Sequence, residues 1–273
     1  MGFVYALIAA GLSLIFGLME IVNFAHGEFL MLAMFGSFWA WSLAGLDPLL
    51  SLPLTVAGLA ALGVATYYGL IRFILGAPML AQIFATFGLG VFLRSAAQAL
   101  WGVDFHLVKD PLVHGRVSAG GIFIGLPQLV ASVGALAAFA FLYWFITRTE
   151  TGMALQATAQ DRQAASLMGI DTERMFALGW GIGAACVGVA GALLTMFFYV
   201  FPEVGGSFAL LAYVAVALGG FGNVPATLVG GVVVGLVEVI GGLVIAPSFK
   251  YVVVFALYLA VVLWRPQGLF GRF

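Results

Sequence analysis

The stretch "IVNFAHGE", residues 21–28, places polar side chains that can do chemistry between two apolar runs. His26 and Glu28 are possible metal ligands, and within a membrane each could carry a proton. The metal interpretation is weak, because two ligands stand two residues apart without an H-E-x-x-H motif or a third ligand nearby. A proton relay and a gate on a transport pathway both remain open.

A structural interpretation of the same residues is favoured. Asn23 and Glu28 can satisfy free backbone groups at a break between two helices, with Glu28 in the first turn of the second helix, near its positive end. We expect this break, which also includes His26 and Gly27, to lie at the cytoplasmic end of a path through the membrane.

The composition places these residues in lipid. The chain has 273 residues, of which 64% are hydrophobic and 8% charged, with a mean hydropathy of +1.17. Soluble domains carry about 25% charged residues, and a helix needs about 20 apolar residues to cross the hydrocarbon core. Long runs without Asp, Glu, Lys or Arg therefore predict an all-α polytopic membrane protein. The net charge of −1 gives no electrostatic reason to expect a nucleic-acid partner.

Eight or nine membrane-spanning helices are predicted. The uncharged run 204–237 would be about 51 Å long as one helix, against a hydrocarbon core of about 30 Å. "GGFGNVPA", residues 219–226, breaks this run into two short spans or a re-entrant pair. Gly222, Asn223 and Pro225 in that break either cap a helix start or line a pore. The expected spans are 2–19, 27–45, 52–72, 79–100, 128–147, 174–200, 208–221, 223–244 and 249–264.

The distribution of Lys and Arg predicts the orientation. Placing the polar segment 148–174 in the cytoplasm, together with Arg72 and Arg265, leaves Lys109, Arg116 and Lys250 outside. The N-terminus is then external, the C-terminus cytoplasmic, and the polar segment 101–127 an external loop.

Three further charges lie within or beside apolar runs. Glu238 is the most isolated, and we expect it to pair with a residue of a partner subunit or to line the path, because a lipid-facing carboxylate costs a few kcal/mol. Glu20 and Arg94 are expected to snorkel from the ends of spans.

The segment 148–174 contains small and apolar residues between polar ones. Gly169 is expected to end a short helix, and Asp171 to cap the next one. The segment is either an ordinary polar connector or a pair of short helices outside the bilayer that dock into a groove on a soluble partner.

Four motifs, in order along the chain, resemble a known family: "YALIAAGLSLIFGLMEIVNFAHGEFLML" (5–32), "GMALQATAQDRQAASLMGID" (152–171), "VALGGFGNVPATLVGG" (216–231) and "RPQGLFG" (265–271). They are similar to permease subunits of branched-chain amino-acid ABC importers, and most similar to the first of the two paired permeases. Importers of urea and short amides are close relatives. The short segment that precedes the first motif in the family is largely missing, so a few upstream residues are expected.

The resemblance implies a single transmembrane permease domain over residues 1–273, in an inner membrane of bacterial type. Such a chain pairs with a second permease, usually a related but different one. Two cytoplasmic ATPases bind and hydrolyse ATP, and a periplasmic binding protein delivers the substrate. Which amino acid, urea or amide is carried stays open, because selectivity is expected to rest on the binding protein.

By the same resemblance, residues 152–171 form the coupling element that sits in a cleft of the ATPase. No catalytic residue, metal or cofactor of its own is expected, since the chain has no G-x-x-x-x-G-K-[ST] phosphate loop. The alternative is an autonomous channel or ion-coupled carrier for a small polar solute such as urea or an amide. The expected coupling residues are Gly152, Ala157, Asp161, Ala164, Ala165, Leu167, Met168, Gly169 and Asp171.

Overall fold

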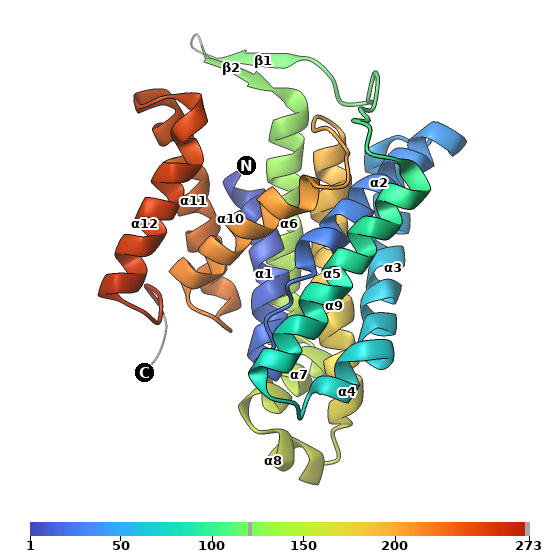
Figure 1. The fold of residues 1–273 in the computed structure, drawn as a ribbon, viewed down its shortest axis with the longest axis vertical. Helices are drawn as coiled ribbons and strands as arrows, with labels where there is room; N and C mark the ends of the chain where they lie inside the picture. Colours follow the sequence, from blue (N-terminus) through green and yellow to red (C-terminus); the bar gives the residue numbers. More distant parts are fainter. Residues whose placement is uncertain (120–121, 271–273) are drawn as a thin grey trace.

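The computed structural model describes residues 1–119 and 122–270, and it is built almost entirely of helices (Figure 1). A two-stranded hairpin, β1 (Arg116–Ala119) and β2 (Ile122–Gly125), stands at one end. The helices are α1 (Gly2–Met19), α2 (His26–Ala44), α3 (Pro48–Thr66), a π-helical turn η1 (Tyr67–Ile71), α4 (Arg72–Ile74), α5 (Met79–Trp101), α6 (Leu126–Arg148), α7 (Glu150–Gln160), α8 (Arg162–Leu167), α9 (Thr172–Thr195), α10 (Val204–Gly219), α11 (Val224–Val244), a 3-10 turn η2 (Pro247–Phe249) and α12 (Lys250–Trp264).

Within the described residues, seven helical stretches are long and apolar enough to cross a membrane. The chain is therefore a polytopic, all-α membrane protein, and the predicted fold class is confirmed. The shorter apolar helix α10 has 16 residues. The seven stretches are Gly2–Met19, Pro48–Ile74, Met79–Trp101, Leu126–Arg148, Thr172–Thr195, Val224–Val244 and Pro247–Trp264.

The bundle has two distinct ends (Figure 1). The hairpin end carries β1 and β2 and the start of α1, and the α8 end carries α7, α8 and the start of α9. Each of the nine predicted spans overlaps an observed helix, with ends that differ by up to about five residues, because each is an apolar run bounded by polar or turn residues. Two of these helices, α2 and α10, start inside the bundle and not at one of its ends.

The core of the bundle is formed by α1 and α9. In their spanning windows 72% and 78% of the residues are buried, against 11% in α5 and 6% in α12. The outer faces of α5 and α12 carry large exposed apolar side chains, including Phe84, Phe92 and Leu263. Such faces suit lipid or another membrane subunit.

The predicted external loop 101–127 contains the β1–β2 hairpin, which the all-α prediction did not include. Val117 pairs with Ile124 in an antiparallel register, and these β-branched residues favour extended backbone. Earlier in the loop, the His106 N–H donates to the Val200 carbonyl over 2.9 Å, and the Val200 N–H donates back over 2.8 Å. This bridge ties the loop to the segment that leads into α10.

The predicted break at 219–226 is a tight reversal between α10 and α11. The two helices pack antiparallel, with Gly219 beside Ala226 and Gly230 beside Ala215. At 21 residues α11 is long enough to cross the membrane completely, whereas α10 begins within the bundle. The region differs from both alternatives, because a short helix is followed by a helix long enough to cross the membrane.

Candidate functional site

The segment that joins α1 to α2 runs from the end of α1 into the interior of the bundle. The chain leaves α1 after Met19, and α2 restarts at His26, whose Nε2 lies 2.9 Å from the carbonyl oxygen of Ile8. Ile8 stands eleven residues before Met19 in α1, which is about 16 Å of helix. The start of α2 is thus level with the middle of α1, so the break extends from the end of α1 into the middle of the bundle, beyond the end at which the sequence places it.

Buried hydrogen bonds hold the extended chain of this break. The Asn23 side chain accepts from the Ala25 N–H over 3.1 Å, as the sequence predicts for a residue that satisfies free backbone groups. The Tyr213 hydroxyl donates to the Asn23 carbonyl over 2.6 Å, and the Thr86 hydroxyl donates to the Val22 carbonyl over 3.2 Å. The break is therefore connected to both α5 and α10.

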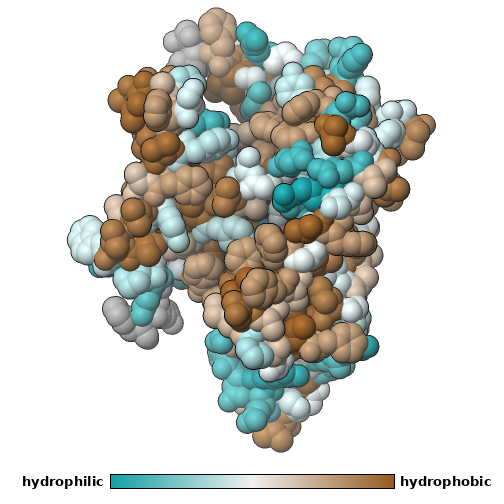
Figure 2. Space-filling view, viewed as in Figure 1, coloured by the Kyte–Doolittle hydropathy of each residue, from teal (hydrophilic) through white to brown (hydrophobic). Residues whose placement is uncertain are grey.

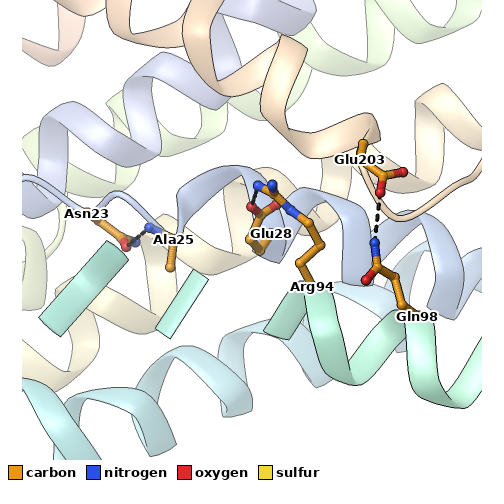
Figure 3. Close-up of polar contacts among 6 residues, drawn as sticks. All are labelled: Asn23, Ala25, Glu28, Arg94, Gln98 and Glu203. Carbon is orange, nitrogen blue, oxygen red and sulfur yellow. Dashed lines mark hydrogen bonds and ion pairs between the residues drawn. The ribbon is translucent and has the colours of Figure 1, made fainter. Parts of the chain in front are cut away.

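Glu28 lies in the first turn of α2, as predicted, but its side chain has a different partner from the one expected. It does not cap the helix, and forms an ion pair with Arg94 of α5 (Figure 3). Arg94 therefore does not snorkel from a span end. Glu28 is 4% exposed, whereas the Arg94 side chain is 39% exposed, so the pair reaches from the core to the outer face of α5.

The starts of α2 and α10 meet at this pair. A Cβ on Gly27 would lie 2.5 Å from the Gly205 carbonyl oxygen, so only glycine allows the two backbones to approach this closely. A Cβ on Gly205 would lie 2.9 Å from Glu28 Oε2. Two helix N-termini, each with a partial positive charge, therefore converge near the Glu28 carboxylate.

A second polar contact extends the site along α5. Glu203 directly precedes α10, and its Oε1 accepts a hydrogen bond from Gln98 Nε2 over 2.8 Å (Figure 3). Gln98 stands one helical turn after Arg94. In Figure 2, hydrophilic residues gather among hydrophobic ones where α5 passes the start of α10. We call Glu28, Arg94, Gln98 and Glu203 the α5 polar site.

The remaining residues predicted for the pathway lie elsewhere. Glu238 is at the hairpin end of α11, where Tyr5 Oη and Lys250 Nζ each donate to its carboxylate over 2.7 Å. It pairs within this chain, whereas a pair with a partner subunit was one of the two expectations. It is buried because α1 and α12 close over it.

Gly222, Asn223 and Pro225 lie near the α8 end. Asn223 caps α11 by accepting from the Ala226 N–H over 3.2 Å, and Pro225 is in the first turn of that helix. The cap prediction is confirmed. Asn223 and Pro225 also line a cavity of about 700 Å³ between the end of α1, the end of α6, and α7. The α5 polar site does not border this cavity.

The segment 148–174 folds as predicted into short helices at the α8 end. Asp161 caps α8 by accepting from the N–H groups of Gln163 and Ala164 over 2.8 and 2.9 Å. Gly169 follows α8 with φ +84°, and Asp171 caps α9 by accepting from the Arg174 N–H over 3.0 Å. As predicted, Gly169 ends one short helix and Asp171 caps the next helix.

The predicted coupling residues divide by exposure. Gly152 and Ala165 are buried and pack the short helices onto the bundle, and Ala157 is half-buried. Leu167 and Met168 are 88% and 83% exposed, which makes them an apolar tip at the end of α8. The other members, Asp161, Ala164, Gly169 and Asp171, are exposed around that tip.

Comparison with known proteins identifies the family. A model of the branched-chain amino acid transport system / permease component matches residues 1–262. This chain belongs to that permease family. The predicted resemblance is confirmed over nearly the whole chain. No solved structure matches this permease significantly.

Known proteins with similar sequences are also permeases of branched-chain amino acid transport. This permease is 32% identical to the high-affinity branched-chain amino acid transport system permease protein BraD of Pseudomonas aeruginosa, over 99% of this chain and 92% of that protein. It is 33% identical to the corresponding protein LivH of Salmonella typhimurium, over 100% of this chain and 92% of the relative. A probable LivH of Methanocaldococcus jannaschii is 27% identical, over 97% and 88%.

Sequence reasoning missed three members of the α5 polar site. The expectation places Arg94 at a span end, although the uncharged sequence on both sides puts it well inside a helix, where a charge is a functional signal. Gln98 stands one turn further on, and a helical projection from Arg94 would have found it. Glu203 carried no comparable signal, because its position depends on where α10 begins.

Proposed function

We propose that this chain is the membrane-spanning permease subunit of an ATP-binding cassette importer for branched-chain or related amino acids. Transport is driven by separate ATPase subunits, and the chain itself is not an enzyme. The proposal draws its substrate class from the relatives, whose names specify branched-chain amino acid transport. It places the chain in an inner membrane, with the hairpin end outside and the α8 end in the cytoplasm.

The observation that carries the coupling proposal is the exposed tip Leu167–Met168. Two large apolar side chains, more than four-fifths exposed, stand at the C-terminal end of a short helix that Asp161 caps at its start and that Gly169 follows. A rigid helix with an apolar tip fits a groove on a soluble subunit. The tip therefore binds a cleft of the ATPase, and ATP-driven closure of the ATPases moves α7 and α8.

We assign each remaining partner to one end or one outer face of the bundle. A periplasmic binding protein delivers substrate at the hairpin end. A second permease, related but different, covers one of the apolar outer faces, for which α5 and α12 offer large exposed surfaces. ATP is bound by the ATPase partners, and this chain needs no cofactor.

The test is reconstitution in lipid vesicles of this chain with a second permease, two ATPases and a binding protein. Leucine uptake should require all components and ATP hydrolysis. Uptake by this chain alone at the rate of the full assembly would instead establish an autonomous channel or carrier. Calorimetry on the binding protein, with leucine, isoleucine, valine, urea and acetamide as ligands, determines the substrate.

A further inference from the structure

The α5 polar site lies on a surface that lipid cannot satisfy. Arg94 is seven residues before the end of α5, which is about 10 Å inside the spanning helix. Its side chain is 39% exposed, and Glu203 beside it is exposed. Exposed charges at this depth belong against protein or a water-filled path.

Hydrogen-bonding groups in this site are unused. Among the described residues, Glu28 Oε2 and Arg94 Nε are buried without any hydrogen-bond partner. Glu28 itself is 4% exposed, so water does not reach it from the outer face as it reaches Glu203. Both atoms belong to the Glu28–Arg94 ion pair, so this buried pair does not use all of its hydrogen-bonding groups.

The charges of the site match those of an amino acid. Arg94 is a cation with a partly exposed guanidinium, which suits a carboxylate. Glu203 is an anion, and Gln98 holds it one turn along α5 from Arg94. An α-amino acid carries its carboxylate and its ammonium on one carbon atom, so it needs opposite charges side by side.

The rest of the same face of α5 is apolar. Phe87 and Val91 precede Arg94 at helical spacing, and their side chains are 57% and 47% exposed. The face thus carries a polar part and, directly beside it, an apolar part. An amino acid with an aliphatic side chain has the same two parts.

We propose that the α5 polar site binds the zwitterionic head group of the transported amino acid within the permease. Arg94 binds the α-carboxylate, Glu203 binds the α-ammonium, and Phe87 and Val91 contact the aliphatic side chain. This inference rests on the proposed function. It favours a zwitterion over urea or an amide, because a neutral solute has no use for paired opposite charges.

The experiment uses the complete assembly in vesicles, with the binding protein saturated with leucine. Arg94→Met should lower uptake at least tenfold per assembled transporter, while ATP hydrolysis per assembled transporter stays near the wild-type level; the amount of assembled transporter is expected to fall, because the variant leaves the buried Glu28 carboxylate without its cation. Arg94→Lys, which retains the charge, should lose several-fold less than Arg94→Met. Arg72→Met is the matched control, since Arg72 lies at the α8 end near Glu173, and it should stay within twofold of wild type.

A diazirine-bearing leucine analogue gives an independent readout. On illumination during turnover it should label the peptide that contains Val91 and Arg94, and excess leucine should suppress the labelling. Arg94→Met should abolish it. Labelling that is unchanged in Arg94→Met, or uptake by this variant within twofold of wild type, would overturn the proposal.

Other outcomes are equally decisive. If Arg94→Met loses the second permease on purification in proportion to the lost uptake, the surface is a subunit interface and the substrate site is wrong. If Arg94→Met fails to insert into the membrane, Glu203→Gln tests the proposal instead. Its side chain is exposed, and its amide oxygen can still accept the hydrogen bond from Gln98, so the fold is retained. Glu203→Gln should reduce uptake about fivefold, and unchanged uptake would refute the proposed substrate site. Failure of the wild-type assembly to import leucine would instead refute the proposed function.

Discussion

Gly27 and Gly205 bring two helix starts into backbone contact in the interior of the bundle. A Cβ on Gly27 would lie 2.5 Å from the Gly205 carbonyl oxygen and 2.8 Å from the Ala209 Cβ. Neither atom belongs to a flexible side chain that can move aside. The close approach brings Glu28, in the first turn of α2, to the start of α10.

Gly27→Ala should therefore destabilise the protein. The added methyl group forces the two helices apart, and overpacking of this kind costs about 1–3 kcal/mol. The measurement is thermal unfolding of the purified protein in detergent. Gly36→Ala is the matched control, because Gly36 is in the same helix and a Cβ there meets nothing within 4 Å. Equal melting temperatures for the two variants would contradict the packing described.

Asp161→Ala should weaken coupling between ATP hydrolysis and uptake. Its carboxylate accepts from two N–H groups at the start of α8, and loss of such a cap costs about 1 kcal/mol. The exposed tip is then held less firmly, so fewer substrate molecules enter per ATP hydrolysed. Asp161→Asn keeps an acceptor oxygen and should stay close to wild type. A loss as large in Asp161→Asn as in Asp161→Ala would mean that the charge, and not the cap, matters.

Leu167→Ser combined with Met168→Ser should reduce ATPase binding without affecting the fold. Burial of one large apolar side chain contributes about 1.5–3 kcal/mol, so the affinity for the ATPase should fall at least about tenfold. Both side chains are almost fully exposed in the isolated chain, so its melting temperature should not change.

The measurement is binding of the purified ATPase to the permease in lipid nanodiscs. Leu112→Ser is the control, because Leu112 is 63% exposed in the loop at the hairpin end. Wild-type affinity in the double variant would refute the docking role of the tip.

Local patterns predicted much of this structure. The apolar runs predicted the helices because lipid requires continuous backbone hydrogen bonding over about 20 residues. Gly169 and Asp171 were assignable because a helix end and a helix cap depend on residues three or four positions apart. Asn23 was assignable for the same reason, since its partner is Ala25.

Contacts between distant residues were not predictable in this way. Glu28 and Arg94 are 66 positions apart, and their pairing depends on where α5 packs against α2. The bond from Gln98 to Glu203 requires that α10 begin inside the bundle, which no local pattern specifies. The same holds for Glu238, whose partner Tyr5 is 233 positions away.

The pairing of Glu238 gives a last prediction, on stability and transport together. Lys250→Met removes one of two donors from a carboxylate that is 7% exposed. Breaking a buried ion pair from one side costs about 3–5 kcal/mol, and the 36% exposure of the Lys250 side chain reduces this to about 1–3 kcal/mol. Adding Glu238→Gln should restore most of the lost stability, because the neutral amide still accepts from the Tyr5 hydroxyl.

A double-mutant cycle of melting temperatures measures this coupling. If the double variant melts as low as Lys250→Met alone, the two residues do not act as a pair. The double variant also separates structure from pathway. Glu238 lies at the hairpin end, joined to α1 and α12, so once folded this variant should import leucine at no less than half the wild-type rate. An intact fold with abolished uptake would return Glu238 to the pathway and contradict its assignment as a link between α1, α11 and α12.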